Sequence, residues 1–368
     1  MKQQKLWLKW LFCIIPASIA LLMYFILPHF PHFTEYVITR VIFRAVTFPI
    51  EWIVSFLPFS LTETVVVLCL PVILSLLTVW VIRIIRSSEK IRTVEKGVRF
   101  TAWCLSLALF IFMLTDGANF SRLTVSELLK LPQKQYTAQE LYILTSDLAT
   151  KASAAREKLK EDENGYTKLS VSQSELLLKA DDCYDALKEE YPFLVTGVWR
   201  VKPVILSHAW SYTGYTGVYC PWLMETSINV DVPDCDLGHT AAHEIAHTMG
   251  FAKENECNFL SWLACSKSGQ PDYEYSGHLQ AYIYCSNALY DADRELWKKS
   301  YQNCSDGVLR DLKQRNEYWK QFQGEVMESS QNFNDTFIKV NGVESGVLSY
   351  NEMVELMLKY YDKNNMLK

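Results

Sequence analysis

Long uninterrupted runs of apolar residues occupy the first third of the chain. Residues 10–28 and 64–82 contain no charged side chain, and residues 100–115 form a shorter third run. A helix that crosses the hydrocarbon core of a bilayer needs about 20 apolar residues. The pattern therefore predicts three membrane-spanning helices in a membrane domain of residues 1–116, with the lipid bilayer as a partner.

Residues 30–58, between the first two runs, are only partly apolar. Arg40 and Arg44 stand one helical turn apart among aliphatic side chains. This pattern favours an amphipathic helix that lies on the membrane surface, or a re-entrant segment. A fourth span at this position is the alternative, and it would invert the orientation of everything that follows.

Basic residues are distributed unevenly around the three runs. Only Arg40 and Arg44 are strong bases between the first two runs, whereas the loop at 83–99 is rich in them. Because basic loops stay in the cytoplasm, the N-terminus and this loop are predicted to be cytoplasmic. A multi-pass protein of the cell membrane with three spans then carries residues 117–368 outside the cytoplasm.

Beyond residue 116 the apolar positions follow mainly the period of a helix, and short strands are expected within 194–232. Residues 228–232 alternate between apolar and polar, which predicts a half-exposed edge strand. A substrate peptide could add to such an edge, although an ordinary edge strand fits the pattern equally well. The predicted fold class is α+β, mostly helical, with a small sheet. The clearest helical stretches are 136–162, 172–190, 309–322 and 350–361.

The chain contains one HExxH pattern, formed by His243, Glu244 and His247. On a helix this spacing lets two imidazoles bind one zinc ion while the glutamate faces the metal-bound water. Asp236 is expected to cap the helix, and Gly250 to end it in a left-handed conformation. The pattern predicts a Zn2+ site with His243 and His247 as ligands, although two histidines on an amphipathic helix can also be ordinary core or surface residues.

A catalytic zinc site needs a third protein ligand. Position 253, where one large group of zinc peptidases has a third histidine, is Lys253, so the candidates are Glu254 and Glu256 at the start of the next helix. Glu256 shares its helical face with large apolar side chains and is predicted to point inward, and Glu254 outward. Because a buried carboxylate needs a partner or a metal, Glu256 is expected to be the third ligand, with Glu254 as the alternative.

Polar and aromatic side chains near the motif are candidates for binding substrate or stabilising an oxyanion, and no spacing singles one out. Asn258 could orient a ligand histidine, or be an exposed polar residue. The other candidates are His208, Tyr212, Tyr215, Tyr219, Glu225 and His239 before or within the motif helix, and Tyr273, Tyr275 and His278 after it.

The ten cysteines show no CxxC spacing typical of a metal site, so they are interpreted as structural. Seven of them lie outside the predicted spans, an odd number, which leaves at least one thiol unpaired within the chain. Cys220 and Cys235 flank one loop segment and could pair. Cys257 and Cys265 lie about 12 Å apart along one predicted helix, too far to form a disulfide.

Charge indicates the surroundings of the motif and the class of partner. Acidic residues precede it, and Lys253 and Glu254 follow it, so the motif lies in water and not in lipid. The net charge is -5 and the basic residues are dispersed among acids. Nucleic acid is therefore not expected as a partner.

Nearly the whole chain resembles a bacterial membrane family catalogued as domain of unknown function 3810, whose members are regarded as zincin-like metallopeptidases. The resemblance implies a zincin-like domain with zinc, and it supports Glu256, which resembles the third ligand of gluzincins. Relatives tend to have alanine where this chain has Cys257, a small change beside the ligand. The resemblance is carried by the N-terminal spans and by residues 217–219, 231–247, 256–260, 275–277, 334–336 and 349–350.

The expected function is a membrane-anchored zinc-dependent metallopeptidase, a hydrolase with Glu244 as the general base. Its substrates are expected to be peptides or proteins outside the cytoplasm or close to the membrane. The alternative is a zinc-binding sensor or scaffold of the cell envelope without catalysis. Glu244 favours the enzyme, because a purely structural zinc site has no need of a general base.

Overall fold

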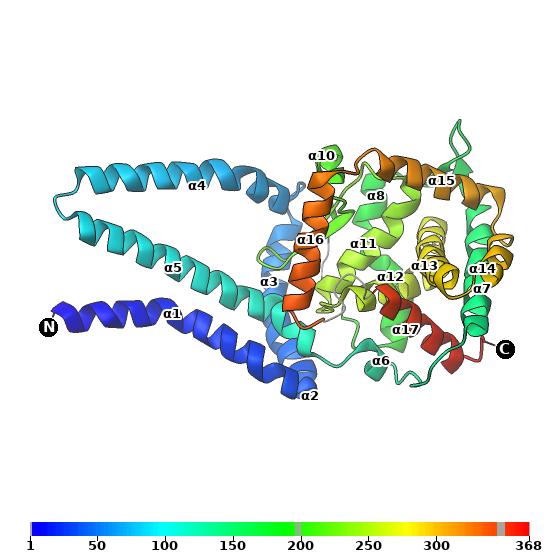
Figure 1. The fold of residues 1–368 in the computed structure, drawn as a ribbon, viewed down its shortest axis with the longest axis horizontal. Coiled ribbons are helices and arrows are strands. Elements are labelled where there is room, and N and C mark those ends of the chain that lie inside the picture. The colour runs from blue at the N-terminus through cyan, green and yellow to red at the C-terminus, as the bar shows by residue number, and fades with distance from the viewer. Residues whose placement is uncertain (1, 196, 198–199, 344–349, 368) are drawn as a thin grey trace.

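The computed structural model describes residues 2–195, 197, 200–343 and 350–367. Long helices extend from one side of a mostly helical globular body (Figure 1). Within the described residues, three of these helices are long and apolar enough to cross a membrane: α1 (Lys2–Ile26), α4 (Leu61–Arg86) and α5 (Lys90–Thr115). The three predicted helices are confirmed, and the side of the membrane on which each end lies stays a prediction.

The long helices are packed unevenly. The N-terminus and the turn between α4 and α5 lie at the same far end, opposite the globular body (Figure 1). Along α1 and α5, the main-chain N–H of Ala17 donates to Ser106 Oγ at 2.8 Å. Near their shared turn, α4 and α5 meet so closely that a Cβ on Gly97 would lie 2.2 Å from Trp80 Nε1. From there, α4 diverges from α5 toward the globular body (Figure 1).

Residues 30–58 pack against the globular body on one side and expose apolar side chains on the other, and a position on the membrane surface stays a prediction. They contain the short α2 (Pro31–Phe33), a π-helical segment η2 (Thr34–Phe43) and α3 (Arg44–Ser55), and none of these is a candidate span. Their polar side is turned toward protein and not toward water, as shown by the buried residues Thr34, Glu35, Thr39, Thr47 and Glu51.

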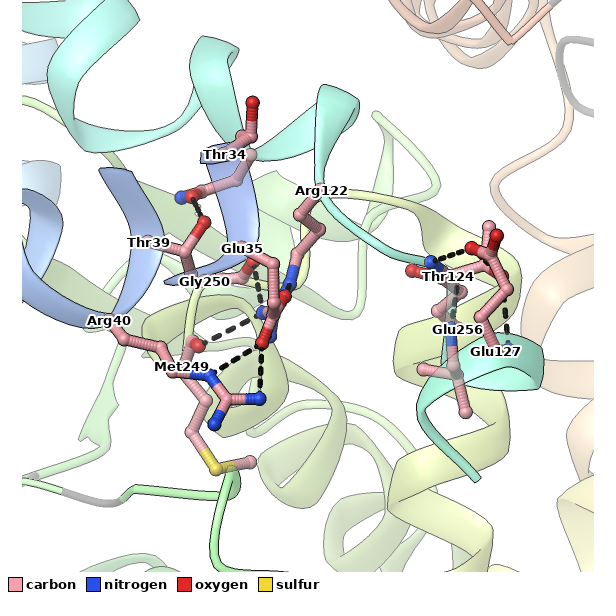
Figure 2. Close-up of polar contacts among 12 residues, drawn as sticks. Thr34, Glu35, Thr39, Arg40, Arg122, Thr124, Glu127, Met249, Gly250 and Glu256 are labelled. Carbon is pink, nitrogen blue, oxygen red and sulfur yellow. Dashed lines mark hydrogen bonds and ion pairs between the residues drawn. The ribbon is translucent and has the colours of Figure 1, made fainter. Parts of the chain in front are cut away.

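A buried ion cluster fixes this segment to the rest of the molecule (Figure 2). The Glu35 carboxylate accepts hydrogen bonds from Arg40 Nε at 2.8 Å and from Arg122 Nε, also at 2.8 Å. Arg122 Nη1 also donates to Gly250 O at 2.7 Å, and Arg44 Nη2 donates to Met249 O at 3.0 Å. Arginines of this cluster and its neighbourhood therefore hold the carbonyl end of the helix that carries HExxH, where a positive charge is favourable.

A second buried ion pair fixes the start of α4. Lys202 Nζ lies 2.6 Å from Glu225 Oε1, and both side chains are 1% exposed. The same carboxylate accepts hydrogen bonds from the main-chain N–H groups of Leu61 and Thr62, in the first turn of α4. Because Glu225 binds both Lys202 and the first turn of α4, it belongs to the attachment of the membrane helices and not to the candidate site.

The sheet of the globular body has three short strands in the order β3-β5-β4. β3 (Lys202–Pro203) is parallel to β5 (Glu225–Ile228), and β4 (Gly217–Cys220) is antiparallel to β5, with Gly217 opposite Ile228. The prediction of an edge strand over 228–232 is wrong: the strand ends at Ile228, is central, and is buried throughout. The polar residue Asn229 donates to Ser211 Oγ inside the protein at 2.9 Å, which explains the misleading alternation.

Helices form most of the globular body, as predicted, and α7, α15 and α17 correspond to three of the four expected stretches. The stretch 172–190 is broken into α8, a 3-10 turn η4 and α9. A small hairpin, β1 (Lys160–Glu161) with β2 (Thr167–Lys168), stands apart from the sheet. The helical elements are η3 Gly117–Ser121, α6 Val125–Leu128, α7 Ala138–Arg156, α8 Gln173–Leu178, η4 Ala180–Tyr184, α9 Asp185–Glu190, α10 Ser207–Ser211, α11 Asp234–Thr248, α12 Glu254–Lys267, α13 Pro271–Ala292, α14 Arg294–Tyr301, α15 Asp306–Lys320, α16 Glu325–Val340 and α17 Tyr350–Lys363.

The ten cysteines, all within the described part of the chain, are free. Cys220 lies at the end of β4 and Cys235 is buried in the first turn of α11, so the pairing considered for them does not occur. Cys257 and Cys265, on α12, are unpaired as predicted.

Candidate metal centre

The HExxH motif lies on α11, which has the expected end but a different beginning. The helix starts at Asp234 after Pro233, and Asp236 forms an ion pair with Arg315 instead of capping the helix. Gly250 follows the helix with φ +80°, the left-handed conformation predicted for it. A Cβ at this position would also lie 3.0 Å from Thr39 Cγ2, so the close approach of η2 favours glycine as well.

Three side chains converge at the motif. His243 Nε2 and His247 Nε2 lie 3.2 Å apart. Glu254 Oε2 is 3.2 Å from His243 Nε2, and Glu254 Oε1 is 3.7 Å from His247 Nε2. The ligand atoms of these three residues all lie within 4.8 Å of one another, a spacing at which they could hold a metal ion.

The structure places Glu254, and not the expected Glu256, beside the two histidines, and the metal ligands themselves stay a prediction. Glu256 is buried, as its helical face predicted, but its Oε1 accepts a hydrogen bond from the main-chain N–H of Val125 at 2.9 Å (Figure 2). A buried carboxylate needs a partner, and Glu256 has one in the first residue of α6. Burial raises the pKa of Glu256.

Glu254 faces the cluster because it is the first residue of α12. Side chains on a helix lean toward its N-terminus, so a side chain in the first turn reaches back toward the preceding segment. Here that segment is the short connection from α11. Burial raises the pKa of Glu254, but protonated imidazoles would outweigh this through a hydrogen bond from His243 and the charge of His247, and would hold that pKa at about 2.

The outer nitrogen of each histidine has an oxygen partner. His243 Nδ1 lies 3.0 Å from Asn258 Oδ1, and His247 Nδ1 lies 2.8 Å from Phe251 O. A carbonyl oxygen only accepts, so each Nδ1 carries the proton and each Nε2 presents a lone pair to the cluster. Asn258 therefore occupies the orienting position considered for it.

Glu244 lies beside the cluster under strand β4. It is buried, and its Oε2 has no hydrogen-bond partner among the described residues. A Cβ on Gly217 would lie 2.6 Å from Glu244 Oε1, so glycine allows the strand to approach this carboxylate. Burial raises the pKa of Glu244 to about 8. A divalent cation next to this carboxylate would lower that pKa.

A cavity of about 550 Å³ opens over the motif. One part of its wall is polar and comes from α11, α13 and α15, namely His239, Gln280, Tyr284 and Arg315. Another part is aromatic and comes from α5, α16 and the turn after β4, namely Phe112, Trp222, Phe333 and Phe337. Gln280, Tyr284, Arg315 and Asp116 are cavity residues that the sequence did not single out, since each comes from an element distant from the motif along the chain.

The structure separates the sequence candidates into two groups. Tyr215, Tyr219 and His239 line the cavity. The others lie outside it; for example, His208 Nδ1 lies 2.9 Å from Asp231, and Tyr273 donates to Leu176 O at 2.7 Å. The residues outside the lining are His208, Tyr212, Glu225, Tyr273, Tyr275 and His278.

Comparison with known proteins gives one match. A family model described as "Protein of unknown function (DUF3810)" matches residues 38–358. Searches of curated proteins and of solved structures find no match. The matched region begins within η2, so it includes residues 38–58, which pack against the globular body, as well as the candidate site.

Proposed function

The chain belongs to the DUF3810 family, and we propose that it is a membrane-anchored zinc-dependent peptidase with His243, His247 and Glu254 as metal ligands. The observation that carries this proposal is the convergence of two imidazole nitrogens and one carboxylate within 4.8 Å. Two histidines and one carboxylate, with a fourth position open, are typical of catalytic zinc sites.

The surroundings of the three ligands fit a catalytic ion better than a structural one. A structural zinc site is closed by four protein ligands, whereas this group has three and opens into a cavity. The buried Glu244 Oε2 has no partner among the described residues, which leaves it free to accept a proton. A zinc ion bound here would supply a water of lowered pKa and polarise a carbonyl group.

Each of the chain's own groups then has a part in peptide hydrolysis. Glu244 accepts a proton from water and returns it to the amine that leaves. Strand β4 is an edge strand of the sheet and passes close to Glu244, so an extended peptide could pair with it. Tyr284 and Arg315, on the polar wall, are placed to bind polar groups of that peptide.

The first test is the zinc content of the purified full-length protein in detergent, measured by elemental mass spectrometry. We expect about one zinc ion per chain in the wild type and almost none in His243→Ala and Glu254→Ala. Glu256→Gln is the matched control: it lies two positions further along the same helix and keeps an oxygen for the Val125 N–H. It should retain the zinc.

Each result has a clear meaning. Loss of zinc in Glu256→Gln with retention in Glu254→Ala would restore Glu256 as the ligand. A well-folded wild type that binds no zinc would overturn the peptidase proposal. Zinc binding without hydrolysis of any peptide would favour the sensor or scaffold.

A further inference from the structure

The candidate metal centre is separated from a membrane helix by one aromatic ring. Tyr219 stacks on His247, with ring centroids 6.1 Å apart and ring planes 10° from parallel. The Tyr219 hydroxyl donates to Thr115 O at 3.4 Å, and Thr115 is the last residue of α5. With α5 crossing the bilayer, the metal centre therefore lies at the membrane surface.

One wall of the cavity extends beyond Thr115 along α5, toward the interior of the bilayer. Trp222, in the turn between β4 and β5, lines the cavity and donates its indole N–H to Ala108 O at 3.0 Å. Ala108 precedes Thr115 by about two helical turns, or ~10 Å along the helix axis. Trp222 is half exposed and packs against Phe112, with ring centroids 5.9 Å apart. A tryptophan with an apolar body and one polar N–H suits this depth in a bilayer.

Helix α16 covers the same side of the cavity and is attached to the membrane helices. Its Phe337 contacts Phe112 of α5, and Tyr24 of α1 donates to Val340 O at 2.6 Å. Figure 1 shows α16 between the membrane helices and α11. Phe333 lines the cavity but is 72% exposed, and Val340 is 60% exposed. The membrane-facing rim of the cavity is therefore apolar.

Among the described residues, no helix packs along most of α4. None of its most apolar stretch is buried, and it diverges from α5 toward the globular body (Figure 1). Between their shared turn and the globular body, both helices expose apolar side chains, such as Leu70 of α4 and Leu105 of α5, and we call the space between these diverging helices the wedge (Figure 1). Helices in a bilayer associate by close packing, so an unpaired helix face of this kind can receive another spanning helix.

We propose that the substrate is a second membrane protein whose spanning helix lies in the wedge between α4 and α5 and whose chain is cut just outside the bilayer. This inference rests on the proposed peptidase function. A chain that leaves the bilayer beside α5 meets the aromatic wall first and the metal ligands directly above it. A soluble peptide lacks the helix that would bring it to this wall.

The test uses the zinc-loaded full-length protein in vesicles of phosphatidylethanolamine and phosphatidylglycerol. The probe is a designed leucine-alanine helix of about 20 residues, enough to span the bilayer. It is followed on the side of the globular body by a randomised flank of about 30 residues, whose mean reach as a flexible chain is ~30 Å. The same flank without the helix is the soluble probe. Mass spectrometry measures the rate and the position of each cut.

We expect most cuts within about eight residues of the probe's helix, at rates at least tenfold above those for the soluble probe, since the helix raises the local concentration of substrate. Cuts spread evenly along the flank, or equal rates for the soluble probe, would overturn this inference while the peptidase proposal stands. Lipid alone would then occupy the wedge. No cutting of either probe by zinc-loaded protein would overturn both.

Two variants test whether the substrate chain passes the apolar rim of the cavity. Phe333→Asp places a charge on the exposed cavity rim and should slow cutting of the membrane probe about tenfold, because a chain that packs against this rim would have to desolvate the carboxylate. Val326→Asp is the control: Val326 is also exposed on α16, at 58%, but does not line the cavity. It should change the rate less than twofold, with zinc content unchanged in both variants. Equal slowing in the two variants would contradict the proposed path.

Discussion

Two clusters of buried charge lie near the C-terminal half of α11, and they are completed in different ways. The first is the ion cluster around Glu35, which we call the docking cluster. In it, Glu35 is paired with Arg40 and Arg122, and Arg122 also donates to Gly250 O. In the candidate metal centre, no lysine or arginine among the described residues pairs with Glu244 or Glu254. The first cluster contains its own positive charges, and the second does not.

The difference indicates which cluster is built to bind something else. A buried carboxylate is unfavourable unless it is paired, and a fully paired one is part of the architecture. Glu254 has only two histidines beside it, each of which presents a nitrogen lone pair. Among the described residues, the candidate metal centre therefore has no lysine or arginine to pair with its carboxylates, whereas the docking cluster is paired within the chain.

The largest effect is expected in the candidate metal centre, from Glu244→Gln. It should lower the rate of peptide hydrolysis about a thousandfold, because an amide cannot accept the proton from water. Zinc content should stay that of the wild type, since Glu244 is not one of the converging ligands. Glu256→Gln, assayed in parallel, should hydrolyse at the wild-type rate. Equal turnover by Glu244→Gln and wild type would remove Glu244 from the mechanism.

The next largest effect is expected in the docking cluster. Arg122→Met removes the guanidinium that is 2% exposed and leaves Glu35 buried, which should destabilise the fold by about 3 kcal/mol. Arg40→Met breaks the other pair of the same carboxylate, but Arg40 is 35% exposed and its loss should cost less than about 1 kcal/mol. Thermal unfolding in detergent measures both. Similar losses in the two variants would contradict the assignment of Arg122 as the central partner.

A smaller effect is expected from the support of His243. Asn258→Ala removes the oxygen 3.0 Å from His243 Nδ1 and should weaken zinc binding about tenfold. Competition with a chelator measures this change. Asn255→Ala is the matched control on the same helix, because Asn255 donates to Glu352 and not to a histidine. Zinc affinity lowered equally in both variants would show that the effect is general to α12.

The smallest change in stability is expected for Glu51, a buried carboxylate of α3. Burial raises its pKa from 4.5 to about 8, so the folded protein holds a proton there that the unfolded chain releases. This contribution to stability is complete below pH 4.5 and is lost as the pH rises to about 8. Glu51→Gln should therefore stabilise the fold at pH 8 by on the order of 1 kcal/mol and have little effect at pH 5. A melting-temperature difference that is the same at both pH values would contradict this.

The sequence predicted the features that depend on local pattern. Apolar runs located the three long helices, HExxH located His243 and His247, and Gly250 marked the end of their helix. These features follow from residue spacing within one element, which the chain displays directly. The mostly helical character of the globular body followed from the same kind of pattern.

The choice between Glu254 and Glu256 could not be made locally. The helical face of Glu256 was predicted correctly, but its partner is an N–H from α6, 131 residues earlier in the chain. In the same way, the sequence did not show the partners of Arg40 and Arg44, because Glu35 and the carbonyl that follows α11 are brought to them only in the folded molecule. The cavity residues Tyr284 and Arg315 have no sequence signal, since helix packing alone brings them to the motif.

The attachment of α4 has a consequence for how the protein is made. The buried carboxylate of Glu225, on the central strand, takes two hydrogen bonds from the first turn of α4, and its partner Lys202 also donates to Val54 O at 2.8 Å. Until the first turn of α4 and the end of α3 are in place, the Glu225 carboxylate and its partner Lys202 lack these contacts inside the protein. Closure of the sheet is therefore coupled to the placement of the early helices, so the globular body of a newly synthesised chain is completed only together with them.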